Sequence, residues 1–225
     1  MSNIQSSISN AQGKSRVRGI DAILLIGITG SGKTPLGQLL EAKGLWGRRC
    51  FHFDFGANLR AVASDRRQGR IGITSSERGR VIKSLQTGRL LTGKEFPIAM
   101  KILKAFSVRK RVDRQDLLIL NGLPRHIGQA KRVDRMVQIL AVIHLVCGPR
   151  TTVRRIKLNA GGDRNGRTDD MPAQVRKKLE IFAKQTAPLL DHYRRKGVRI
   201  LPVNVELKTT AEDIRDMLET KGRVD

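Results

Sequence analysis

The sequence predicts an α/β protein in which a five-stranded parallel sheet is covered by helices on both faces. Three observations predict this class. Apolar runs alternate along the chain with segments of helical periodicity. Glycine or proline ends most of these runs. The chain has 225 residues, enough for one ordinary domain, and its hydrophobic residues, 39% of the total, are grouped in blocks that can form a core.

The expected strands are short, continuous apolar runs, a pattern typical of strands buried on both faces. They cover residues 22–27, 50–53, 116–120, 137–147 and 198–203. Helices are expected over residues 33–43, 126–134, from the Gly148–Pro149 stop to about 158, 172–196 and 210–220. The segment from about 57 to 110 is also helical in pattern, with breaks expected at Gly69, Gly72, Gly88, Gly93 and Pro97.

The composition limits the classes of partner. The formal net charge is +24 and the isoelectric point is near 11.3. Such a charge favours an anionic partner, which can be a nucleotide, a nucleic acid or an acidic surface. Aromatic residues make up only 4% of the chain, which leaves little material for stacking bases.

The cysteines and the N-terminal residues indicate the cellular setting. Cys50 and Cys147 lie in apolar runs and are expected to be buried structural residues of an intracellular, cytoplasmic protein. No apolar run approaches the roughly 20 residues that span a bilayer, so no membrane contact is expected. Residues 1–20 are polar and are expected to form a disordered tail before a single domain over 21–222.

The most informative stretch is the loop between the first strand and the first helix. Residues 27–34 read GITGSGKT and fit the pattern G-x-x-x-x-G-K-[ST], in the strand–loop–helix context that this pattern requires. The pattern predicts a P loop that holds a nucleoside triphosphate. Its candidate ATP-binding residues are Gly27, Ile28, Thr29, Gly30, Ser31, Gly32, Lys33 and Thr34.

Phosphate chemistry explains why these residue types occur at this spacing. Glycines let the backbone turn so that several N–H groups point at phosphate oxygens. The helix that follows adds its positive end. Lys33 brings a charge to the outer phosphates, and the Thr34 hydroxyl is a candidate ligand of Mg²⁺. The loop alone leaves the phosphate acceptor open.

Three further motifs follow the P loop: HFDFGANLRA at 52–61, LILNGLPRHIGQA at 118–130, and GRTDD at 166–170 followed by a long helix. In this order and spacing, the chain resembles the adenylate kinase family of nucleoside monophosphate kinases over residues 22–220. The resemblance implies a P-loop fold with a helical monophosphate-binding insertion at about 54–95 and a lid at about 157–170. The lid resembles the short form, so no structural zinc is expected.

The resemblance also implies roles for individual residues. Arginines and lysines are implied to hold and stabilise the phosphates, as candidate catalytic residues with Lys33: Arg125, Arg155, Arg167 and Lys178. The AMP-binding residues implied are Phe55, Arg60, Leu91, Gly122, Arg125 and Gln129, with Gln129 reading adenine. Asp169 and Asp170 match aspartates at the end of the lid. Thr34 and Asn121 are the implied, indirect contacts of Mg²⁺.

Several positions depart from the family pattern. Asn121 stands where the family has an aspartate that helps to organise the magnesium, so the metal site lacks that charge. Phe55 replaces a usual threonine near the monophosphate base. Lys178 aligns with a phosphate-binding arginine, and lysine lacks the bidentate fork of arginine. Asn159 falls near another arginine position of the lid, and Arg154 is an alternative to Arg155.

The leading hypothesis is a monomeric ATP:AMP phosphotransferase that uses Mg²⁺ with ATP as its substrate. A second hypothesis is a kinase for another nucleoside monophosphate or a small phosphorylated acceptor, because of Phe55 and Asn121. A third is a weakly active or inactive nucleotide-binding protein that engages RNA or another polyanion, because of the charge of +24.

Overall fold

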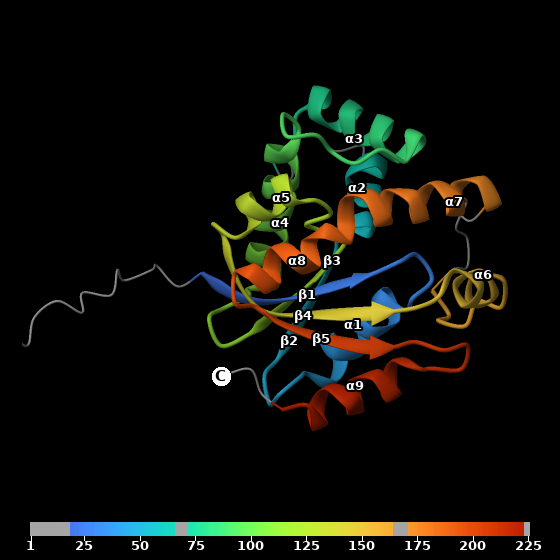
Figure 1. Ribbon diagram of the computed structural model, residues 1–225. Coiled ribbons are helices and arrows are strands. Elements are labelled where there is room, and N and C mark those ends of the chain that lie inside the picture. The colour runs from blue at the N-terminus through green and yellow to red at the C-terminus, as the bar shows by residue number, and fades with distance from the viewer. Residues whose placement is uncertain (1–18, 66–71, 164–170, 223–225) are drawn as a thin grey trace, which may run out of the picture.

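The computed structural model describes residues 19–65, 72–163 and 171–222, and places a parallel sheet of five strands at the centre of the protein (Figure 1). The strand order is β2-β3-β1-β4-β5, and every pairing is parallel. The strands are β1 (Ile20–Gly27), β2 (Cys50–Asp54), β3 (Leu117–Asn121), β4 (Val137–Val146) and β5 (Arg199–Asn204). The predicted five-stranded parallel sheet is confirmed.

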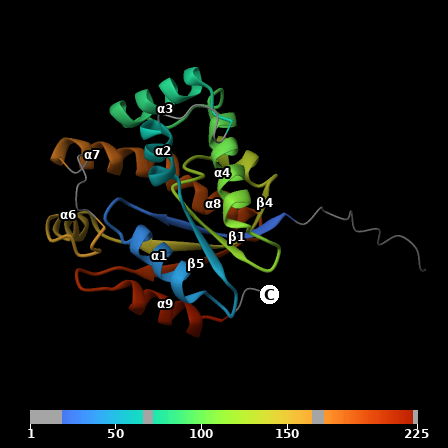
Figure 2. The same cartoon turned by 180° about the vertical axis from the view of Figure 1, so that it is seen from behind.

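Helices cover both faces of this sheet, as the turned view in Figure 2 also shows. One face carries α1 (Lys33–Lys43) and α9 (Ala211–Thr220). The opposite face carries α4 (Phe96–Lys110), α5 (Ile127–Val133) and α8 (Pro188–Arg195). Successive residues of β1 alternate between the two cores: Leu24 packs with the α4 side and Ile23 with the α1 side. This two-sided burial explains why the strand reads as a continuous apolar run.

The remaining helices stand near the carboxyl ends of the strands. They are α2 (Phe55–Ser64), α3 (Ser75–Thr87), α6 (Pro149–Lys157) and α7 (Pro172–Ile181). In Figure 1, α3 lies above α2, α7 lies beside α2, and α6 lies past the end of β4. The expected insertion at 54–95 includes α2 and α3. The expected lid at 157–170 begins at the last residue of α6, and its residues 164–170 lie outside the described residues.

Two helical predictions need correction. The predicted helix over 172–196 is interrupted by a π-helical segment η1 (Phe182–Thr186), where the Ala187 N–H donates to the Phe182 carbonyl at 2.8 Å. Pro188 follows Ala187 and has no N–H to donate. This favours a local change in the helical hydrogen-bond pattern. Pro97 was expected to break a helix, but it lies in the first turn of α4, where proline is well tolerated.

Other expectations are settled only in part. Cys50 is buried as predicted, and burial raises the pKa of its thiol to about 12. Cys147 is only half-buried, because β4 ends at Val146 and the chain turns outward there. The expected tail, residues 1–20, lies almost entirely outside the described residues. None of the described helices is both long and apolar enough to cross a bilayer.

An ion pair between Arg89 and Glu95, in the segment that joins α3 to α4, gives a first testable prediction. Glu95 accepts two hydrogen bonds of 2.6 Å from Arg89, and this pairing lowers the pKa of the Glu95 carboxyl from 4.5 to about 2. Because the folded pKa is lowered, the stabilisation is present above pH 4.5 and is lost as the pH falls toward 2. We expect Glu95→Gln to lower the free energy of unfolding by about 1.5–3 kcal/mol at pH 7.

Urea unfolding of both proteins from pH 7 to pH 2.5 measures this difference. It should shrink steadily below pH 4.5, where the Glu95 carboxylate of the unfolded chain takes up a proton while that of the folded protein stays ionised until about pH 2. Glu180→Gln, at an exposed position on α7, is the matched control and should change little at any pH. A Glu95→Gln difference that stays constant down to pH 2.5 would contradict the assigned role of the ion pair.

Candidate active site

The P loop joins β1 to α1 and has the geometry of a phosphate cradle. Gly30 and Gly32 have φ angles of 77° and 93°, in the left-handed region that glycine adopts without strain. Gly27 is required for a different reason, since a Cβ there would lie 2.6 Å from Ser31 Oγ and 2.9 Å from the Leu145 carbonyl oxygen. The loop therefore leads into the N-terminus of α1, which favours an anion.

Lys33 and Thr34 begin α1 and face the cleft. The Lys33 ammonium donates to the carbonyl oxygens of Gly27 and Ile28 at 2.7 and 2.8 Å, so the lysine is folded along the loop. The Thr34 hydroxyl donates to Asp54 Oδ2 at 3.0 Å. Both side chains line the same cleft as Gly30 and Gly32. The positions expected from the motif are thus brought together at the end of the sheet.

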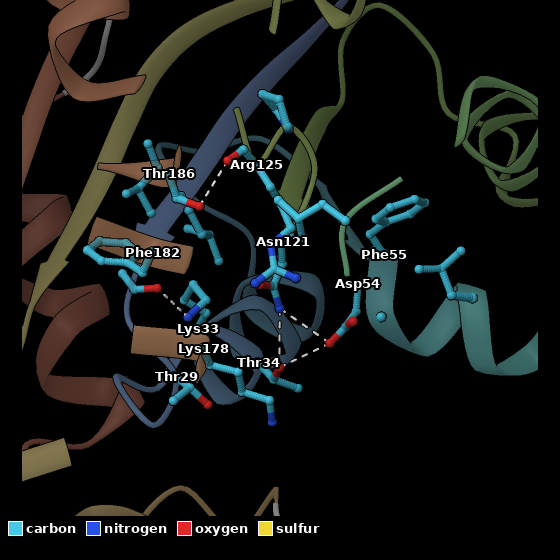
Figure 3. A pocket seen from close by; sticks show the side chains of 18 of the residues that line it. Thr29, Lys33, Thr34, Asp54, Phe55, Asn121, Arg125, Lys178, Phe182 and Thr186 are labelled. Carbon is cyan, nitrogen blue, oxygen red and sulfur yellow. Dashed lines mark hydrogen bonds between the residues drawn. The ribbon is translucent and has the colours of Figure 1, made fainter. Parts of the chain in front are cut away.

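Beneath Thr34, the ends of two neighbouring strands bring Asp54 and Asn121 together. The parallel register of β2 and β3 pairs these two residues directly. Asn121 Nδ2 lies 3.2 Å from Thr34 Oγ1 and 3.3 Å from Asp54 Oδ2 (Figure 3). It is also 3.3 Å from Nε2 of His52, whose pKa is lowered by burial. The result is a small polar cluster at the floor of the cleft.

The opposite wall of the cleft carries Arg125, on the loop between β3 and α5. Burial lowers the pKa of its guanidinium, and among the described residues no acceptor or acidic partner meets that group. The Arg125 carbonyl accepts a 2.9 Å hydrogen bond from Thr186 in η1, which anchors the loop. A half-buried cation without a partner, facing a cleft, is suited to bind an anion. Arg60 and Phe55, from α2, line the same cleft.

The structure gives Gln129 a backbone-bracing position. Its side chain is 1% exposed. Its Oε1 accepts from the Arg125 N–H at 2.8 Å, and its Nε2 donates to the Leu91 carbonyl at 3.2 Å. Gln129, Leu91 and Gly122 all line the cleft. Reading a base with this amide would require at least one of these two bonds to be exchanged.

Arg155 lies against the P loop, where its guanidinium bonds to the backbone. It was expected to close on phosphates, but its side chain is 4% exposed and turned toward backbone carbonyls. Its guanidinium donates to Gly30 at 3.2 Å, to Leu207 and Thr209 at 3.0 Å each, and to Glu206. It therefore braces the P loop against the loop before α9.

This arrangement predicts a stability role for Arg155. We expect Arg155→Met to lower the free energy of unfolding by about 2–3 kcal/mol, because buried carbonyls lose a charged donor. The neighbouring Arg154 is exposed, so Arg154→Met should change stability by less than about 0.5 kcal/mol. Urea unfolding without nucleotide makes this comparison. Equal, small effects of the two substitutions would contradict the bracing role.

The remaining predicted residues divide into two groups. Lys178 lines the cleft from α7, near the P loop (Figure 3). Ile28 and Thr29 lie in the P loop as expected, and Ser31 is fully buried within it. The predicted lid residues Arg167, Asp169 and Asp170 lie outside the described residues.

Sequence reasoning missed several residues of the cleft. They include Asp54, Ser84, Arg89, Phe182 and Thr186. Only Asp54 could have been recognised from the sequence, because it directly follows a predicted strand. Ligands of open α/β sheets bind at the carboxyl ends of the strands. The other four depend on how helices pack above the sheet, which periodicity does not show.

The fold and the cleft define a P-loop kinase fold, and solved structures agree. A gluconokinase from Sinorhizobium meliloti superposes with a TM-score of 0.50 at 16% identity, covering 91% of this chain and 95% of the other. A sugar kinase from Janibacter superposes with a TM-score of 0.52 at 14% identity, covering 89% and 93%. At such identities the likeness supports the fold alone.

Sequence relatives confirm the resemblance to adenylate kinases. Adenylate kinase isoenzyme 1 of Rattus norvegicus is 27% identical over 187 residues, covering 82% of this chain and 86% of the relative. An adenylate kinase of Parvibaculum lavamentivorans is 27% identical over 213 residues, covering 90% and 89%. One of Sinorhizobium medicae is 33% identical over 126 residues, covering 49% and 65%. No protein-family model matches the chain.

Proposed function

We propose that this chain is a nucleoside monophosphate kinase of the adenylate kinase type, which converts ATP and AMP into two molecules of ADP. The observation that carries the proposal is the cleft itself. A P loop with Lys33 lines the cleft, and so does the guanidinium of Arg125, which meets no partner within the part of the chain that the structure describes. Two phosphate-binding elements across one cleft suit transfer between two phosphorylated molecules. The names of the sequence relatives support the same activity.

The chemistry asks the protein mainly for positioning and positive charge. An oxygen of the AMP phosphate attacks the γ-phosphorus of ATP as the bond from that phosphorus to the β–γ bridging oxygen breaks. The P loop and Lys33 hold the triphosphate, and Arg125 with Arg60 holds the phosphate of the acceptor. Lys178 adds charge near the transferred group. Each cation stabilises charge that spreads over the phosphoryl oxygens.

The cluster at Thr34 fits magnesium, the metal that this fold uses with ATP. Its hydroxyl and carboxylate oxygens are the hard donors that Mg²⁺ prefers. Thr34 and Asp54 would hold Mg²⁺ here, and the cation would offset negative charge on the bound phosphates. The described residues contain no group of three or more histidines, cysteines or acids that could hold a metal alone. The arrangement therefore suits a cation whose other ligands are phosphate oxygens.

Two observations favour a second candidate, a kinase for a different nucleotide or small phosphorylated acceptor. Gln129 supports AMP by its place in the motif, but both ends of its amide already bond to the backbone. Phe55 also fills the position near the acceptor base with an apolar ring.

An acceptor panel tests the proposal. Purified protein is mixed with Mg–ATP and, separately, AMP, GMP, CMP, UMP or dAMP, and the diphosphates are quantified. We expect ADP to form fastest with AMP. If UMP or CMP is phosphorylated faster than AMP, that nucleotide is the acceptor and the assignment of AMP is wrong. Absence of product with every acceptor, from protein that binds ATP, would contradict the kinase activity.

A further inference from the structure

We propose that Asp54, at the end of β2, supplies the carboxylate of the magnesium site, in place of the acid that position 121 lacks. The inference rests on the proposed function, because it concerns the cation that accompanies ATP. The negative charge of the magnesium site then comes from β2, whereas the family pattern places it at position 121, on β3. Asn121 then acts as a neutral hydrogen-bond donor beside it.

Three elements hold the Asp54 carboxylate in one orientation. Oδ1 accepts from the Ala57 N–H at 2.8 Å and so caps α2. Oδ2 accepts from the Thr34 hydroxyl of α1 at 3.0 Å and from Asn121 Nδ2 of β3 at 3.3 Å (Figure 3). The carboxylate is therefore fixed beside the hydroxyl that the P-loop motif offers to magnesium. A preorganised oxygen at this point needs little rearrangement to contact the cation or its water shell.

The charge of the cleft explains why this acid implies a cation. Among the described residues that line the cleft, the acidic ones are Asp54 and Asp163, and the others with charge are lysines and arginines. Asp163 lies on the loop after α6, whereas Asp54 lies on the floor next to Thr34. A carboxylate beside bound phosphates repels them unless a cation lies between. Magnesium is commonly held by one or two carboxylates together with substrate phosphates.

The contacts of Asn121 show why a carboxylate is present at position 54 but not also at position 121. Its Nδ2 lies 3.2 Å from Thr34 Oγ1 and 3.3 Å from Asp54 Oδ2, so its two N–H groups can donate to the hydroxyl and to the carboxylate. A carboxylate at this position has no proton to donate and would face the Asp54 carboxylate at the same separation. Like charges so close disfavour each other's ionised forms. An amide at 121 and an acid at 54 therefore form a matched pair.

This pairing predicts the behaviour of nucleotide-free variants. We expect Asn121→Asp to lower the melting temperature at pH 7.5 by about 3–8 °C, because two carboxylates meet. Combining it with Asp54→Asn, which restores one acid and one amide, should recover most of the loss. An Asn121→Asp protein at least as stable as wild type would overturn the geometry on which the inference depends.

The metal itself is tested by binding, without turnover. Mn²⁺ replaces Mg²⁺, and electron paramagnetic resonance measures free Mn²⁺ during titration of protein saturated with the ATP analogue AMP-PNP. We expect Asp54→Asn to weaken Mn²⁺ in this complex at least ~10-fold, while asparagine keeps the α2 cap. The control Asp191→Asn, at an exposed position on α8, should bind Mn²⁺ as wild type does.

The outcomes separate this inference from the proposed function. Wild-type protein that binds AMP-PNP, with an Asp54→Asn variant holding Mn²⁺ within twofold of it, would overturn the assignment of Asp54 and leave the kinase proposal standing. Wild-type protein that binds no AMP-PNP, with or without Mn²⁺, would overturn both. A selective loss of Mn²⁺ in Asp54→Asn, with AMP-PNP still bound, supports the inference.

Discussion

Replacing Lys33 by methionine is expected to lower kcat for phosphoryl transfer by about 10²–10³-fold, the usual cost of removing one preorganised charged donor. Methionine keeps the length and apolar stem of lysine and removes only the ammonium. That ammonium lies along the P loop, within 2.8 Å of the Gly27 and Ile28 carbonyl oxygens, next to the N-terminus of α1. It is therefore placed at the phosphate cradle before any nucleotide arrives.

The measurement is steady-state ADP formation at saturating Mg–ATP and AMP, together with the melting temperature. Lys43→Met is the matched control, because Lys43 lies on the same helix in an exposed ion pair with Glu212. Such pairs contribute little to stability, and this one lies away from the cleft. If the Lys33→Met protein keeps more than half of the wild-type rate, the proposed role of the P loop in phosphoryl transfer is wrong.

Much of the fold was predictable because its signals are local. A buried parallel strand reads as an apolar run, and each of the five runs forms a strand within two residues of the expected ends. The P loop was predictable because phosphate binding requires particular residue types at fixed spacing. Neither prediction depended on knowing which strands are neighbours.

The polar cluster under Thr34 was only half predictable. Thr34 and Asn121 were expected at a metal site, but Asp54 was missed, because its contact with them arises from the pairing of β2 with β3. These strands are separated in sequence by α2, α3 and α4. An acid at the end of one predicted strand becomes informative only when the neighbouring strand is known.

Arg155 and the helical segment from α7 to α8 show a second limit. The motif predicted a cation near the phosphates, but side-chain direction depends on the carbonyls that the loop before α9 presents. The π-helical segment likewise places Thr186 against the Arg125 carbonyl, a contact between residues 61 positions apart in the chain. Periodicity along one helix carries no information about such contacts.

The second large effect is expected at Arg125, where binding and stability should change in opposite directions. Arg125→Met should raise the KM for the phosphorylated acceptor at least about 30-fold, because truncating a buried charged partner of an ion costs several kcal/mol. The same change should leave the ligand-free protein as stable as wild type or more stable. The guanidinium is desolvated and meets no acidic partner among the described residues, so it costs stability until an anion binds.

Three measurements on the same proteins test this opposition: acceptor KM, ATP KM and the ligand-free melting temperature. Arg125→Lys keeps the charge without the fork, so its acceptor KM should fall between those of wild type and Arg125→Met. Arg195→Met, at an exposed position on α8, is the control for loss of one positive charge and should leave both KM values unchanged. If Arg125→Met instead lowers the melting temperature and leaves the acceptor KM unchanged, the guanidinium stabilises the fold, and the acceptor phosphate must bind elsewhere in the cleft.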